Sequence, residues 1–160
     1  MTTNQKVMSQ YSFVTHWTFN APVQEVWREI RDMDGWPEWW KYVRKVQLTK
    51  HGDANDIGSV RRIVWTTALP YQLTFDLALM SVDHHKRIEG KAFGELTGSG
   101  IWTFETDGDI TSVRYDWIVS TSKKWMNFLA PVARPIFSWN HDKVMKAAYE
   151  GLNRRLLSGK

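Results

Sequence analysis

His141 is the polar side chain of this sequence best placed to do chemistry. It falls on the apolar face of a helical pattern that also carries Val144 and Ala148, with Asn140 beside it. An imidazole titrates near neutral pH, so it can act as an acid, a base or a hydrogen-bond anchor. The alternative is a buried histidine whose polar atoms are satisfied by a neighbouring strand or loop. Asn140 is interpreted as a structural hydrogen-bonding residue.

Tyr115 is the second candidate for chemistry. It lies two positions from Trp117 in residues 110–121, which alternate with the period of a β-strand, so both side chains are expected on one face. The phenol could orient a ligand carbonyl or simply complete the core. His141 and Tyr115 are therefore the acid/base candidates, and the catalytic residues stay undefined.

Several other kinds of site are excluded or unsupported. The chain has no cysteine, so disulfides, thiol nucleophiles and thiolate metal sites are impossible. The five histidines have no metal-ligand spacing, and the sequence holds neither an H-E-x-x-H nor a G-x-S-x-G motif. We expect no metal and no cofactor.

Composition favours one domain with a large apolar interior. The chain has 160 residues, and ten of them are tryptophan, which suits either a core of large rings or the wall of a ligand cavity. The net charge of +4 is dispersed along the chain, so we expect no nucleic-acid partner. Residues 1–10 are polar and predict a flexible tail without a signal sequence, followed by one domain over residues 11–158. A cytoplasmic location is expected.

Alternation of apolar and polar residues predicts about seven strands joined by connections too short for crossovers, so the sheet is antiparallel. The expected strands cover residues 11–19, 42–50, 59–67, 71–82, 87–94, 96–106 and 110–121. Glycines clustered between residues 90 and 100 predict strong curvature.

Helical patterns flank this set of strands. Asn20 followed by Pro22 predicts the start of a short helix that ends near Arg31, and a second short helix or turn is expected at residues 38–40. A long helix is expected from 136 to 157, with a helical segment at 125–130 and an interruption at Pro131 and Pro135. The small residues Ala148 and Gly151 on its core face favour a void against the sheet.

This order of elements resembles the helix-grip fold of the START-like (SRPBCC) superfamily, an α+β fold in which a curved seven-stranded antiparallel sheet wraps around a long C-terminal helix, with two short helices between the first two strands. The resemblance is carried by Ala21-Pro22, Val26-Trp27, residues 36–40 (WPEWW), residues 98–102 (GSGIW), residues 115–117 (YDW) and the segment 125–142. The last segment is similar to a bacterial subgroup labelled polyketide cyclase/dehydrase-like. The resemblance implies a hydrophobic ligand rather than a particular reaction.

Three functions follow as hypotheses. The first is binding or transport of a lipid, quinone or polyketide-like aromatic in an internal cavity. The second is a cyclase or dehydrase that uses the same pocket. The third is a protein-interaction module built on exposed Trp39, Trp125 or Trp139. The expected pocket residues are Trp65, Phe75, Leu77, Trp102, Tyr115, Trp117, Asn140, His141, Val144 and Ala148. We also expect transient membrane contact and a monomer or weak homodimer.

Overall fold

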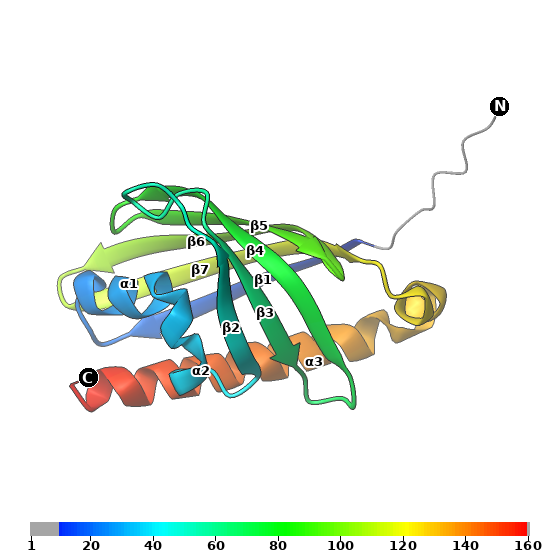
Figure 1. The fold of residues 1–160 in the computed structure, drawn as a ribbon. Coiled ribbons are helices and arrows are strands. Elements are labelled where there is room, and N and C mark those ends of the chain that lie inside the picture. The colour runs from blue at the N-terminus through cyan, green and yellow to red at the C-terminus, as the bar shows by residue number, and fades with distance from the viewer. Residues whose placement is uncertain (1–9, 160) are drawn as a thin grey trace.

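The computed structural model describes residues 10–159. Gln10 is part of the first strand, and the remainder of the predicted tail lies outside the described residues. The elements follow the predicted order of a strand, short helices, six further strands and a long helix (Figure 1). No helix within residues 10–159 is both long and apolar enough to cross a membrane.

One curved, fully antiparallel sheet wraps around the long helix, as the sequence predicts (Figure 1). The spatial order is β1-β7-β6-β5-β4-β3-β2, so β1 and β2 form the two edges. The strands are β1 (Gln10–Phe19), β2 (Val43–Lys50), β3 (Val60–Thr66), β4 (Gln72–Asp83), β5 (Arg87–Gly94), β6 (Leu96–Asp107) and β7 (Ile110–Thr121).

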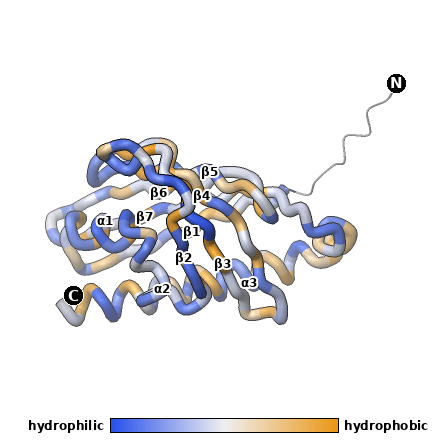
Figure 2. Tube along the Cα trace, in the orientation of Figure 1, coloured by the Kyte–Doolittle hydropathy of each residue, from blue (hydrophilic) through white to orange (hydrophobic). Residues whose placement is uncertain are grey.

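The two faces of the sheet differ because successive side chains of a strand point to opposite sides. Hydrophobic and hydrophilic residues alternate along the strands (Figure 2). In β7, Tyr115 and Trp117 are buried while Arg114 is exposed. Gly100 in β6 leaves the space that these two rings occupy, since a Cβ atom there would lie 2.8 Å from the Tyr115 hydroxyl. The predicted inward faces are confirmed.

Short helices close one end of the sheet. They are α1 (Val23–Arg31), the 3₁₀ turn η1 (Met33–Gly35) and α2 (Trp36–Trp39). The expected start at Asn20 is wrong, because Pro22 occupies the N-cap position and no side chain caps the helix. The fixed φ of proline suits this boundary without help from a capping side chain.

The long helix α3 (Lys124–Leu157) is continuous, which corrects the expected interruption at Pro131 and Pro135. Figure 1 shows its first turns running in a different direction from the rest, so the helix bends instead of ending. Proline removes one backbone hydrogen bond and pushes the preceding turn aside, which is a common cause of such a bend. Met126 and Phe137 are buried on either side of the bend, and this packing holds the two segments together.

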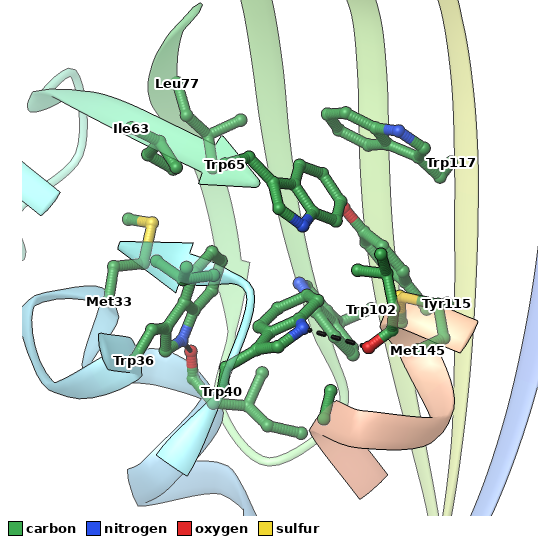
Figure 3. Packing of buried hydrophobic residues seen from close by; sticks show 14 of the residues in the cluster. Met33, Trp36, Trp40, Ile63, Trp65, Leu77, Trp102, Tyr115, Trp117 and Met145 are labelled. Atoms are coloured by element: carbon green, nitrogen blue, oxygen red, sulfur yellow. Dashed lines mark hydrogen bonds between the residues drawn. The ribbon is translucent and has the colours of Figure 1, made fainter. Parts of the chain in front are cut away.

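The expected void beside Ala148 and Gly151 is not present. Gly151 lies against the backbone of α2, where a Cβ atom would come within 1.7 Å of the Trp39 carbonyl oxygen. The Trp40 indole N–H donates to the Val144 carbonyl at 3.2 Å (Figure 3). Small residues therefore allow two helices to touch, and tryptophan rings fill the space between α3 and the sheet.

Candidate functional site

Three cavities lie in series between the sheet and the elements that cover it. The Gly100 cavity is lined by Ile30, Arg31, Met33, Trp36, Leu77, Ala78, Leu79, Ile88, Gly90, Gly100, Trp102 and Tyr115. The Trp40 cavity is lined by Trp36, Trp40, Val43, Ile63, Trp65, Phe75, Leu77, Tyr115 and Trp117, so the two cavities share Trp36, Leu77 and Tyr115. The Trp40 cavity in turn shares two rings, Trp65 and Trp117, with a third cavity, the His141 cavity. Figure 3 shows the aromatic rings of Trp36, Trp65 and Trp102 close to Trp40. Aromatic side chains thus form most of the walls that neighbouring cavities share.

The His141 cavity is the largest of the three. Its empty space is about 500 Å³ including the opening to solvent, compared with about 350 Å³ and 260 Å³ for the others. Residues from β1, the β3–β4 region, β6, β7 and the middle of α3 surround it. They are Tyr11, Phe13, Trp65, Thr67, Tyr71, Leu73, Leu96, Trp117, Val119, Phe137, Asn140, His141 and Val144.

His141 is held against an aromatic wall. Its ring stacks on Phe13 with centroids 4.0 Å apart and planes 9° from parallel. The side chain is buried, and burial lowers the pKa of the imidazole from 6.5 to about 4, because the charged form would lose its hydration. The imidazole is therefore neutral at physiological pH and presents one donor and one acceptor.

Asn140 fastens the β3–β4 connection to α3. Its side-chain oxygen accepts a hydrogen bond from the Ala68 N–H at 3.0 Å, and its amide nitrogen donates to the Tyr71 hydroxyl at 2.9 Å. Burial is the main cause that raises the pKa of Tyr71 above its usual value, so the phenol stays protonated. One side chain thereby fixes both the position of the loop and the orientation of a phenol at the cavity wall.

Polar atoms without a partner gather around this one cavity. Among residues 10–159, four buried side-chain nitrogen or oxygen atoms have neither a hydrogen bond nor an ion pair: Tyr11 Oη, Trp39 Nε1, Trp65 Nε1 and His141 Nε2. Three of the four belong to residues that line the His141 cavity, and one of these, Trp65, stands in the wall shared with the Trp40 cavity. An unpaired buried polar group costs about 1–3 kcal/mol, so a molecule that supplied partners here would recover that energy.

Comparison with known proteins gives the family. A family model described as polyketide cyclase / dehydrase and lipid transport matches residues 10–158. The chain belongs to this family. No curated protein matches the sequence significantly.

Solved structures share the fold of this member of the polyketide cyclase / dehydrase and lipid transport family. The Zhui aromatase/cyclase from a Streptomyces species superposes with a TM-score of 0.73 at 16% identity, covering 92% of this chain and 94% of that one. A START superfamily protein from Mycobacterium smegmatis gives 0.75 at 11% identity, with 93% and 99% covered. A Thermus thermophilus protein gives 0.72 at 17% identity, with 94% and 99% covered. The predicted resemblance is confirmed, and at these identities it concerns the fold.

The residues predicted for the pocket of this family member divide among the three cavities. Trp65, Trp117, Asn140, His141 and Val144 line the His141 cavity. Phe75, Leu77, Trp102 and Tyr115 line the Trp40 or Gly100 cavities. Ala148 is fully buried and lines none of the three.

The two acid/base candidates are not brought together. Tyr115 stacks on Trp102 at 3.8 Å and lines the other two cavities, whereas His141 lines neither of them. Complete burial also raises the pKa of Tyr115 far above its ordinary value, so this phenol stays neutral. Trp65 and Trp117 form the wall that the His141 cavity shares with the Trp40 cavity.

Sequence reasoning missed the residues at the open side of the site. Tyr11 was predicted only as the first residue of a strand, although it lies two positions before Phe13 and so shares its face. Alternation could have found it. Tyr71 is the first residue of the strand expected over 71–82 and lies two positions before Leu73, so alternation also indicates its inward direction.

Proposed function

We propose that this protein binds an apolar, aromatic small molecule that carries hydrogen-bonding groups, and that the ligand occupies the His141 cavity. The observation that supports this most directly is the coincidence of three unpartnered polar atoms with one largely aromatic cavity. Ligand sites are typically apolar hollows lined by aromatic side chains with a few placed polar groups.

Ring stacking defines the class of ligand. Phe13 and His141 already present two parallel ring planes, and Tyr11, Phe137 and Trp117 add further aromatic surface. Planar ligands bind such walls by offset or edge contacts. A phenolic or quinone-like aromatic compound fits this wall better than a saturated acyl chain, because its oxygen atoms can pair with Tyr11 Oη, Trp65 Nε1 or His141 Nε2.

The geometry supports binding more strongly than acid/base catalysis. A general base works best when its pKa lies near the working pH, and the pKa of His141 is about 4. Within residues 10–159, no hydrogen bond or ion pair joins His141 to a carboxylate. We therefore assign His141 the role of a neutral hydrogen-bond anchor, in a protein whose family description covers both cyclase and lipid-transport members.

Titration of tryptophan fluorescence with a panel of hydroxylated polycyclic aromatics, quinones and fatty acids tests the proposal, since Trp65 and Trp117 line the cavity. The decisive variant is His141→Phe, which keeps an aromatic ring against Phe13 but removes the polar atoms. We expect its affinity for the best ligand to fall about tenfold, the value of one hydrogen bond. The matched control is His16→Phe, on the exposed face of β1.

Two results would refute this function. One is the absence of any binding across the panel, checked independently by native mass spectrometry of gently purified protein. The other is equal affinity for wild type and His141→Phe. Turnover of a polyketide-like ligand by wild type but not by His141→Phe would instead give His141 a catalytic role.

Two further expectations stay predictions. They are the cytoplasmic location and the monomer or weak homodimer.

A further inference from the structure

The first half of α3 exposes large apolar side chains that no other part of residues 10–159 covers. Phe128 and Val132 are the most exposed, at 84% and 82% of their surface. The full set is Trp125, Phe128, Leu129, Val132, Ile136 and Trp139, called the α3 apolar surface below. Isolated exposed apolar residues are ordinary, but a contiguous patch usually marks an interaction site.

The spacing places this surface on one side of the helix. From Leu129 to Trp139 its members follow at steps of three, four and three residues, the repeat of one helical face. The opposite side packs into the protein through Met126, Ala130 and Phe137. This half of α3 is therefore apolar on two sides, although only one of them meets the core.

Tryptophan is distributed unevenly between the core and this surface. Eight of the ten tryptophans are buried, and the two exposed ones, Trp125 and Trp139, both belong to the α3 apolar surface. An indole combines a large apolar ring with one polar N–H, which suits the boundary between lipid headgroups and acyl chains. Trp39, also predicted to be exposed, is buried.

The charge of this segment distinguishes between two candidate partners, an anionic membrane and a second copy of the chain. Residues 123–143 contain the four basic residues Lys123, Lys124, Arg134 and Lys143 and one acidic residue, Asp142. Lys123 pairs with Glu95, while Lys143 lies above the Trp139 ring at 5.6 Å. A second copy on a two-fold axis would place like charges opposite one another, whereas an anionic surface complements them. Apolar rings flanked by lysine are typical of a helix that lies in a membrane interface.

We propose that the α3 apolar surface docks on anionic membranes. The α3 apolar surface lies next to the His141 cavity. Trp125 contacts the ring of Tyr71 at a centroid distance of 5.4 Å, and Tyr71 lines that cavity. The first turns of α3 also lie at the end of the molecule, beyond the sheet (Figure 1). Docking would bring the acyl region of a membrane next to the cavity. The docking itself needs no ligand in the cavity.

Vesicle co-sedimentation tests the proposal with the full chain. The vesicles are phosphatidylcholine alone, or phosphatidylcholine with phosphatidylglycerol at a ratio of about 7:3. We expect binding to the mixed vesicles that weakens as salt is added. The double variant Phe128→Ser/Val132→Ser should bind about tenfold more weakly or less, since it removes inserted apolar area. The matched control is Leu157→Ser, which changes an exposed apolar residue at the other end of the same helix.

Fluorescence locates the contact. Trp125 and Trp139 should be quenched by lipids brominated in the acyl chains, and a Trp125→Phe/Trp139→Phe variant should lose most of this quenching because the other eight indoles are buried. Lys124→Glu/Lys143→Glu should reduce binding to the anionic vesicles, while Lys50→Glu, on an exposed position of β2, should not.

Three outcomes would overturn the proposal. They are no binding of wild type to anionic vesicles, unchanged binding by the Phe128→Ser/Val132→Ser variant, and a wild-type dimer that this variant makes monomeric without any vesicle binding. The last outcome would assign the surface to a second copy. None depends on the aromatic-ligand titration, so failure of the proposed function and failure of docking remain separate results.

Discussion

The two halves of α3 are built from similar residues but have different structural roles. The second half is packed as tightly as backbone allows, with Gly151 against the Trp39 carbonyl and Val144 bonded to the Trp40 indole. The middle of the helix lines the His141 cavity through Phe137, Asn140, His141 and Val144, and the first half exposes apolar side chains to solvent. We infer that the closely packed end of the fold is rigid, whereas the other end gives a ligand access to the His141 cavity.

Replacing Gly151 tests the rigid half, and we expect the largest effect there. The Cβ of Gly151→Ala would meet the Trp39 carbonyl oxygen, a backbone atom that can move only if α2 moves. The free energy of unfolding should fall by about 3 kcal/mol, the upper range for overpacking. Urea denaturation measures it. Gly108→Ala, in an open turn at φ +61°, is the matched control and should cost about 1 kcal/mol from backbone strain alone.

Lowering the pH tests the cavity through His141, which lies near the middle of α3. Its folded pKa of about 4 lies below the unfolded value of 6.5, so the unfolded chain takes up a proton first and stability is lost as pH falls through this window. Between pH 7.5 and 5 the loss should be about 2 kcal/mol.

The pH effect is measured by urea denaturation at each pH. His141→Gln should show a smaller loss over the same range, and His16→Gln should behave as wild type. Identical pH dependence of wild type and His141→Gln would show that burial of the imidazole does not control it.

Replacing Asn140 tests how the β3–β4 connection is held against α3. Asn140→Ala loses the bonds to Ala68 and Tyr71, which should cost about 1 kcal/mol of stability. Hydrogen exchange of the Ala68 amide should become faster, while exchange in β7 should not change. Ser138→Ala, at an exposed position of the same helix, is the control. Unaltered exchange at Ala68 would contradict the tether.

The smallest effect on stability is expected at the α3 apolar surface. Phe128→Ser and Val132→Ser change side chains that are more than four-fifths exposed, so each should alter the free energy of unfolding by less than about 0.5 kcal/mol. Thermal melts measure this. A larger loss in either variant would mean that the surface is covered in the folded protein, which would weaken the distinction between the two halves.

The fold was largely predictable because its signals are local. Strand alternation follows from the two-residue period of a β-strand, and it correctly placed Tyr115 and Trp117 on the inner face. Proline was misleading at Pro131, where packing on both sides of the bend keeps α3 continuous. The site was only partly predictable, since Tyr11 and Tyr71 gave no pattern that separates a cavity wall from a core.

The sequence by itself determined the seven strands, the long helix, the family resemblance and the inward direction of His141, because each depends on residue types at short spacings. Tertiary structure alone decided that Trp65 and Trp117 stand between His141 and Tyr115, that Gly151 is a contact and not a void, and that one side of α3 is left exposed by the rest of the described chain. The physical reason is that large rings and close backbone contacts divide an interior according to distances between segments far apart in the chain, and no periodicity along the sequence records those distances.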